Sequence, residues 1–316
     1  MKRVKVFAGA FLCCFLWGSA FPAIKIGYER WGIENGETTR IIGFAGVRFF
    51  LAGILVILAG SLICRKWLIP QINEIPKILL LSLFQTIGQY VLFYLGLAHT
   101  TGVNAAVVDS LTTFFAILIA SLIFRMERLT LRKMIGCIIG FAGVILVNID
   151  GNGFSFDLLG DGLIALSALC YGVSSVMIKR YSAKHDTVLF SGYQFVFGGL
   201  IMVLIGLVFG SGVPVPGEGM DITPALLVLL YLALVSSVAY TLWGLLLKNN
   251  DVSQISVFGF MTPVSGVILS ALMLGETGVI GWQYAGALLL VSVGIVIVNY
   301  KPGLWDSTIG RVTEKS

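Results

Sequence analysis

The stretch AAVVDSLTTFFAILIASLIFRME, residues 105–127, decides the fold because the chain repeats it in altered form. Its second copy, SQISVFGFMTPVSGVILSALMLGE, occupies residues 253–276, and Glu127 of the first copy aligns with Glu276 of the second. The first copy is an apolar run of membrane-spanning length that holds a single acid, Asp109, before its charged end. A long repeat of this kind in a very apolar chain is typical of a transporter built from two halves.

The composition excludes a water-soluble fold. Hydrophobic residues make up 57% of the 316 residues, charged residues make up 12%, and the mean hydropathy is +0.96. Such a chain has too few polar groups to cover the surface of a soluble domain. Its apolar runs are continuous rather than alternating, so the sequence predicts membrane-spanning helices and not a barrel.

Cysteines and histidines give no sign of a metal or a cofactor. Four of the five cysteines lie inside apolar runs and Cys64 ends one, so they behave as small apolar residues. His99 and His185 fall at segment ends and lack metal-ligand spacing. We expect no cofactor, no metal and no nucleic-acid partner. The expected partners are a small-molecule substrate and the lipid bilayer, with a homodimer as one open oligomeric state.

Ten apolar segments of about bilayer length follow one another along the chain. The first, preceded by basic residues, continues past Trp17 without an A-x-A cleavage site, so we expect an uncleaved helix. The predicted segments are 6–26, 41–64, 75–98, 103–124, 132–149, 158–179, 187–209, 224–247, 253–274 and 281–299. The predicted fold is an all-α integral membrane protein with ten transmembrane helices in two inverted five-helix repeats. Its domains are 6–149 and 158–299, with a short cytoplasmic tail at 300–316.

Basic residues predict the orientation of the chain. With the N-terminus inside, 17 of the 21 lysines and arginines fall on the inner side, and only Arg30 and Arg40 fall outside. Lys25 and Arg48 lie within helices. Because inner loops of membrane proteins are enriched in basic residues, we expect both termini in the cytoplasm of a bacterial plasma membrane.

Matching residues run through the whole repeat. Residues 17–19 (WGS) align with 171–173 (YGV), and 47–49 (VRF) align with 193–195 (YQF). Since each half has five helices, the second enters the membrane from the opposite side. Inverted repeats give one chain two nearly equivalent packings, which is a route to alternating access.

The chain resembles the ten-helix EamA-type branch of the drug/metabolite transporter superfamily. The resemblance rests on residues 17–21 (WGSAF), on Arg48 with Phe49, on residues 135–136 (IG) with the glycines that follow, and on residues 275–276 (GE). It covers about residues 8–300 and implies a carrier, often an exporter of amino acids or related metabolites, with a central cavity between the halves. The chain departs from the family at Phe114, where a proline is usual, although its repeat mate Pro263 is kept.

Two ionisable residues lie deep in predicted helices and are candidate coupling groups. Arg48 is seven residues into the second helix and Asp109 is six into the fourth, so both lie roughly 10 Å below the outer face. Charges at such depth are costly, and function is the default hypothesis. We predict that they form a switchable pair; the alternative is a purely structural ion pair.

Polar and aromatic side chains on symmetry-related helices are the remaining candidates for a substrate site. Those on the third and eighth helices share helical faces and would form facing walls, although interhelical hydrogen bonding is the alternative. Large rings could stack on a substrate or fill the core. The complete predicted substrate-binding set is Trp17, Arg48, Gln85, Gln89, Tyr90, Asp109, Tyr171, Gln194, Ser237, Tyr240 and Trp243.

The expected function is transport of a small polar metabolite, with efflux as the expected direction. An intramembrane enzyme would need a nucleophile with a base, a metal cluster or paired deep carboxylates, and the sequence offers none of these patterns. A non-transporting scaffold would not require an inverted repeat. No ATP-binding motif occurs in the sequence, so direct hydrolysis does not drive transport in this chain.

Overall fold

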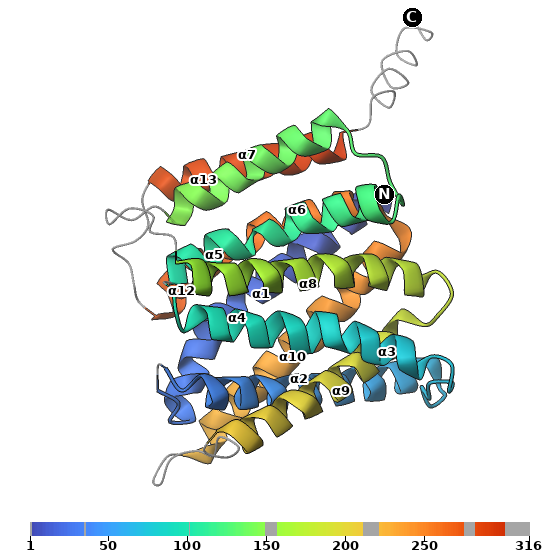
Figure 1. The fold of residues 1–316 in the computed structure, drawn as a ribbon, viewed down its shortest axis with the longest axis vertical. Coiled ribbons are helices and arrows are strands. Elements are labelled where there is room, and N and C mark those ends of the chain that lie inside the picture. Colours follow the sequence, from blue (N-terminus) through green and yellow to red (C-terminus); the bar gives the residue numbers. More distant parts are fainter. Residues whose placement is uncertain are drawn as a thin grey trace, which may run out of the picture.

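The structure is a computed structural model that describes residues 2–34, 36–100, 102–148, 157–210, 221–274 and 282–300. Every regular element within these ranges is helical (Figure 1). Glu276, which closes the second copy of the repeat, and the predicted tail from residue 301 lie outside the described residues.

The first repeat makes five passes. The first two are single helices, α1 (Lys2–Arg30) and α2 (Thr38–Cys64). The third joins α3 (Ile75–Ser82), the π-helical segment η1 (Leu83–Gly88) and α4 (Gln89–Leu97). The fourth joins α5 (Gly102–Asp109), α6 (Leu111–Leu118) and the π-helical segment η2 (Ile119–Ile123). The fifth is α7 (Leu131–Asn148).

The second repeat follows the same plan. Its first three passes are α8 (Leu158–Ser182), α9 (Thr187–Phe209) and α10 (Ile222–Asn249). The fourth joins α11 (Val252–Ser256), the 3₁₀ segment η3 (Val257–Phe260) and α12 (Met261–Leu274), and α13 (Trp282–Asn299) is the fifth. Eight of the described stretches are long and apolar enough to cross a membrane, and Ala285–Asn299 is a shorter apolar helix. The ten-helix, two-repeat architecture predicted from the sequence is confirmed.

Aspartates fix where three helices of the second repeat begin. Asp157, Asp186 and Asp221 each precede a helix in extended backbone geometry and accept hydrogen bonds from backbone N–H groups of its first turn. A side-chain oxygen at this position satisfies donors that have no partner inside the helix. The caps explain why α8, α9 and α10 start as they do.

Helices of one repeat pack mainly on helices of the other. At one end of the molecule α2 lies along α9, and at the other end α7 lies along α13 (Figure 1). Between these pairs, α1 contacts α10 and α12, and its counterpart α8 contacts α4 and α6. Exchanging the repeats therefore reproduces the same set of contacts, as expected for a pseudo-two-fold arrangement.

Glycines allow α2 and α9 to approach backbone to backbone. A Cβ atom added at Gly46 would lie 2.6 Å from the backbone nitrogen of Val203, and one at Gly53 would lie 2.6 Å from the carbonyl oxygen of Gly192. Side chains are thus excluded on sterics alone at this contact. Close packing through small residues is the usual way in which membrane helices associate.

The fourth and ninth passes are interrupted at matching places. Ser110 separates α5 from α6, and its counterpart in the repeat, Gly259, lies within η3. In the ninth pass Pro263 lacks an N–H and its ring crowds the carbonyl of Gly259, which accounts for the 3₁₀ turn. The predicted interruption by Pro263 therefore occurs one turn before the proline. Discontinuous helices at such depth are typical of transporter binding sites.

Candidate functional site

Six rings from both repeats meet between the helices, and we call them the central aromatic cluster. Trp17 lies 5.0 Å from both Tyr240 and Trp243, measured between ring centroids. Tyr240 lies 5.1 Å from Phe195, and Phe195 lies 5.3 Å from Phe49. Phe49 in turn lies 4.4 Å from Tyr90, whose hydroxyl is hydrogen-bonded to that of Tyr240 and so closes the circuit. The members are Trp17, Phe49, Tyr90, Phe195, Tyr240 and Trp243.

The central aromatic cluster contains a pair of symmetry-related rings, one from each repeat. Phe49 of α2 and Phe195 of α9 are counterparts in the sequence repeat, and their rings are stacked with an interplanar angle of 12°. The residues before them, Arg48 and Gln194, are also counterparts. The structure thus places a cation and an amide at equivalent positions beside one stacked pair of rings.

Arg48 is buried against rings rather than against a carboxylate. The side chain is 5% exposed, and its guanidinium carbon lies 4.4 Å from the Phe49 centroid and 5.8 Å from that of Tyr90. Its Nε atom has no hydrogen-bond partner among the described residues. Cation–π contacts of this kind contribute about 0.5–2 kcal/mol and leave the N–H groups free to bind an acceptor.

Asp109 lies at the interruption between α5 and α6 and does not contact Arg48. Within the part of the chain that the structure describes, no ion pair joins these two residues. The direct pair predicted from the sequence is therefore not formed in this conformation.

The buried Gln194 side chain has a hydrogen-bond partner for its oxygen but none for its nitrogen among the described residues. Its side-chain oxygen accepts a hydrogen bond of 2.6 Å from the Thr86 hydroxyl, and its backbone oxygen accepts one of 2.8 Å from Ser82. The side chain is fully buried, yet its Nε2 atom finds no acceptor among the residues described. Thr86 belongs to η1, a π-helical segment of the type often found at functional sites.

Four more predicted residues lie around the cluster. Gln85 is buried in η1, and the side-chain oxygen of Gln89, one turn further, has no donor within the described ranges. Tyr171 of α8 packs in the same core as Tyr90 and Tyr240. Ser237 instead donates its hydroxyl to the carbonyl of Leu234 on its own helix, at 2.9 Å. Ser237 is thus the predicted residue whose polar group is already satisfied locally.

The two tryptophan N–H groups of the cluster are further unpaired donors. The Nε1 atoms of Trp17 and Trp243 are buried and have no acceptor in the described structure, and the Trp243 side chain is only 1% exposed. Buried indole N–H groups usually find a partner. Together with the donors on Arg48 and Gln194, they are four unpaired donors on members of the cluster or on residues next to them in the sequence.

Sequence reasoning missed three features of this centre. Phe49 and Phe195 were expected as markers of the repeat, not as the stacked centre of the site. Thr86 was not expected to hold Gln194. Thr113 of α6 donates its hydroxyl to the carbonyl of Ser256 in α11, at 3.0 Å, and so joins the fourth and ninth passes. The sequence signal for this last contact is that Thr113 recurs as Thr262 in the second copy of the repeat.

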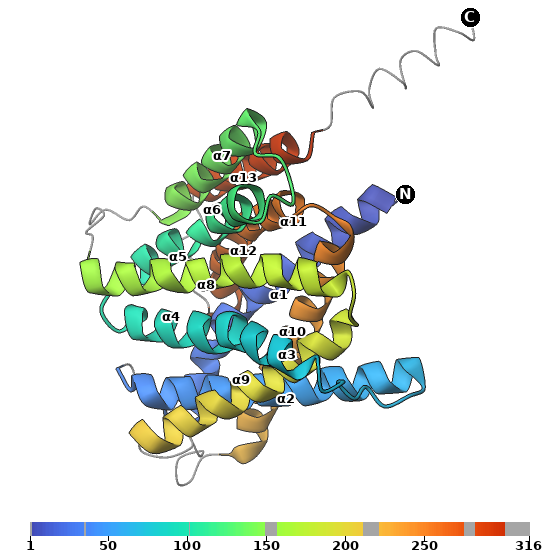
Figure 2. The ribbon, with the colours of Figure 1, turned by 45° about the vertical axis from the view of Figure 1, so that its right-hand side comes forward.

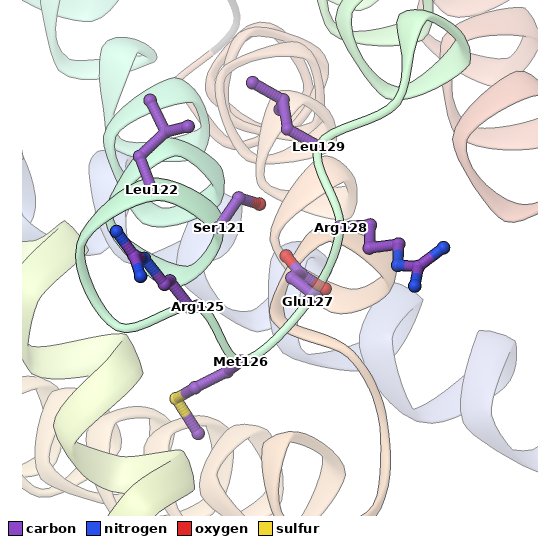
Figure 3. Close-up of a pocket in the computed structure, with 7 residues that line it drawn as sticks. All are labelled: Ser121, Leu122, Arg125, Met126, Glu127, Arg128 and Leu129. Carbon is purple, nitrogen blue, oxygen red and sulfur yellow. The ribbon is translucent and has the colours of Figure 1, made fainter.

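The two repeats are also joined at one membrane face, through Glu127. Its carboxylate accepts hydrogen bonds from the backbone N–H and the hydroxyl of Ser253, at 3.1 and 2.9 Å, and lies 3.3 Å from the Lys133 ammonium. Figure 2 shows α11, which Ser253 helps to begin, beside α6. In Figure 3 the Glu127 side chain lies between Arg125 and Arg128, which point away to opposite sides. We call this contact the Glu127 latch.

Comparisons with known proteins agree with this architecture. The profile of the EamA-like transporter family matches residues 5–149 and again residues 158–300. A solved protein structure superposes with a TM-score of 0.74 at 19% identity, covering 94% of this chain and 96% of that one, which supports the fold.

Curated relatives are similar over nearly the whole chain. The uncharacterized transporter YdfC of Bacillus subtilis is 26% identical over 305 residues, which cover 95% of this chain and 92% of the relative. The uncharacterized inner membrane transporter YedA of Escherichia coli K12 is also 26% identical, covering 95% of both chains. A chloroplastic WAT1-related protein of Arabidopsis thaliana is 28% identical, covering 92% of this chain and 68% of the plant protein. Together with the two-fold profile match, these likenesses confirm the resemblance seen in the sequence: this chain belongs to the EamA-like transporter family.

Proposed function

We propose that this protein is a carrier that exports a small polar metabolite, an amino acid or a related compound, by alternating access between its inverted repeats. The substrate site is the central aromatic cluster together with Arg48, Gln89 and Gln194. The relatives are named as transporters, which supports transport rather than an enzymatic role. The identity of the solute and the direction of movement are our inference from the chemistry of this site.

The unpaired polar atoms of the cluster carry the proposal. The donors are on Trp17, Arg48, Gln194 and Trp243, and the acceptor is on Gln89. An unsatisfied buried polar group costs about 1–3 kcal/mol, so folded proteins keep few of them without a reason. A solute that brings a carboxylate would pair several of these donors at once. Aromatic rings on both sides would cover its apolar part.

The charges Arg48 and Asp109 give the proposal a coupling mechanism. Because the Arg48 guanidinium packs against the rings of Phe49 and Tyr90 in this conformation, its N–H groups can bind the anionic group of a solute. Asp109, at the helix interruption, is then free to bind a proton or the amino group of a zwitterion. Formation of the Arg48–Asp109 pair after the solute leaves would return the empty carrier. Each charge is thus compensated in one stage of the cycle, as buried charges require.

Hydrogen bonds donated by Trp31 to the Ala225 carbonyl and by Thr100 to Asp161 join the repeats at one face, so alternating access would require these contacts and the Glu127 latch to open in turn; the latch joins the repeats at the opposite face. We assign this face to the cytoplasm, with both termini inside, on the strong bias of basic residues toward it. The name of the Escherichia coli relative, an inner membrane transporter, supports a plasma-membrane location.

Ligand-induced stabilisation of the purified protein tests the proposed site. A panel of amino acids and related carboxylates should contain a compound that raises the melting temperature, because a ligand at 100 times its Kd stabilises the native state by about 2.7 kcal/mol. Gln194→Leu should abolish this shift, whereas Ser237→Ala should keep it, because the Ser237 hydroxyl is satisfied on its own helix. A compound that stabilises both variants equally would place the substrate elsewhere.

A further inference from the structure

A hollow of 550 Å³ lies outside the central aromatic cluster and has none of the cluster's members in its lining. It is formed where α3 and η1, the end of η2 and the last turns of α8 come together. Its walls combine apolar and aromatic side chains with four basic ones. The lining residues are Lys77, Leu80, Phe84, Phe124, Val173, Met177, Arg180, Tyr181, Lys184 and His185.

The apolar wall of the hollow continues a surface that faces lipid. On α8, Val173 lies two residues from Tyr171 and hence on nearly the opposite face of the helix from the cluster. Two turns earlier on the same face is Leu166, which is 45% exposed. On the other side of the hollow, Leu80 and Leu83 are also exposed. Exposed leucines on transmembrane helices contact acyl chains, so the hollow opens sideways into the bilayer.

The other end of the hollow carries excess positive charge. The Lys77 ammonium lies 3.0 Å from Nε2 of His185, whose Nδ1 lies 2.7 Å from a Glu74 carboxylate oxygen. Arg180 has its guanidinium 5.9 Å from the Phe124 ring centroid. Neither Arg180 nor Lys184 forms an ion pair with any residue that the structure describes. Three cations therefore face one carboxylate, which is already bonded to the histidine.

We propose that this hollow binds one anionic phospholipid. Its phosphate lies among Lys77, Arg180 and Lys184, and its acyl chains follow Leu80, Phe84 and Val173 out into the bilayer. Cations at the membrane surface attract anionic headgroups, and long basic side chains reach that level while their stems stay in the apolar layer. The apolar wall distinguishes this ligand from a soluble phosphate, which would use only the basic end.

A lipid in this position contacts both repeats. Lys77, Phe84 and Phe124 belong to the first repeat, and Val173, Arg180 and Lys184 belong to the second. The hollow shares no lining residue with the proposed substrate site.

Native mass spectrometry of the full chain in detergent tests the site. We expect phosphatidylglycerol to remain bound when phosphatidylcholine of the same acyl chains dissociates. Arg180→Gln with Lys184→Gln should weaken phosphatidylglycerol binding by roughly fivefold for each charge removed, from about 1 kcal/mol per basic residue near the surface. The control pair Arg128→Gln with Lys248→Gln removes two exposed charges outside the hollow, one in the loop before α7 and one near the end of α10, and this variant should bind as the unmodified protein does.

A steric variant tests the apolar end. Val173→Trp should fill the hollow and displace the lipid, whereas Leu166→Trp, two turns away on the same helix face, should not. Equal retention of the two lipids, equal losses in the two charge pairs, or binding unaffected by Val173→Trp would each overturn the proposal. Full displacement of the lipid by millimolar inorganic phosphate would also overturn it, because it would show an anion site that does not use the acyl chains.

Discussion

At the scale of single residues, the central question is which group accepts a hydrogen bond from the side-chain nitrogen of Gln194. Its side-chain oxygen accepts a hydrogen bond from Thr86, and its side-chain nitrogen has no acceptor in the described structure. Its counterpart Arg48 is a cation whose guanidinium carbon lies 4.4 Å from the Phe49 ring centroid and whose Nε atom is also unpaired among the described residues. The repeat thus supplies two unpaired donors of different charge, and an anionic group would pair them better than a neutral one.

Replacing Gln194 by leucine removes one of these donors and keeps the volume similar. We expect kcat/KM for transport to fall about 10- to 100-fold, because one hydrogen bond to a charged group is worth about 1.5–3 kcal/mol. Stability should change little, since an unpaired buried amide is lost together with one hydrogen bond. Normal transport by purified, folded Gln194→Leu protein would remove Gln194 from the substrate site.

Substitutions at Arg48 and at Asp109 should have different effects on transport and on its pH dependence. Because Arg48 lies on rings, Arg48→Gln should still fold, losing about 0.5–2 kcal/mol of cation–π energy, but should not transport. Asp109→Asn should lose both transport and its pH dependence. Uptake measured across pH 5–9 in the single and double variants decides the matter. A double variant with full transport and an unchanged pH profile would show that neither charge takes part in coupling.

At the scale of helices, the contact between α2 and α9 should tolerate no side chain at its glycines. A Cβ at Gly199 would meet the backbone of Phe50 and the carbonyl of Gly46. We expect Gly199→Leu to lose folded protein in the membrane, because overpacking costs about 1–3 kcal/mol or more when backbone must move. Gly162→Leu is the matched control, since a Cβ there meets no atom within 4 Å. Size-exclusion profiles of the two variants provide the measurement, and equal profiles would contradict this packing.

Helix existence and helix ends were largely predictable from the sequence, but helix irregularities were not. The predicted segment 187–209 coincides with α9, because an apolar run preceded by Asp186 contains both the signal for the membrane and the cap. The interruption at Ser110 has no proline to announce it. The π-helical turns around Gln85 insert an extra residue without altering the apolar character of the run. Such features depend on packing between helices, which hydropathy does not encode.

The sequence selected candidate residues for the site but could not predict their contacts. Polar and aromatic residues on symmetry-related passes were sufficient to select Gln89, Tyr90 and Tyr240. The choice between an ion pair and a cation–π contact for Arg48 depends on side-chain directions that sequence spacing does not determine. Equal depth in the predicted helices put Arg48 and Asp109 in one expected layer, and the structure adds that the Arg48 guanidinium carbon lies 5.8 Å from the Tyr90 ring centroid.

At the scale of the whole molecule, the orientation can be tested by labelling. In a Cys64→Ser background, which removes the exposed native thiol, a cysteine at Glu37 should react with an impermeant maleimide added outside intact cells. A cysteine at Lys184 should react only after the membrane is opened. The opposite pattern would reverse the orientation of both repeats and place the Glu127 latch on the outer face.

The proposed function requires that the inverted repeats move a solute across a sealed membrane. Counterflow in proteoliposomes tests this directly: purified protein is sealed with an unlabelled compound that stabilises it, and the labelled compound is added outside. We predict transient accumulation of label with the unmodified protein and none above protein-free vesicles with Gln194→Leu. Binding of the compound without any counterflow by the unmodified protein would contradict the account.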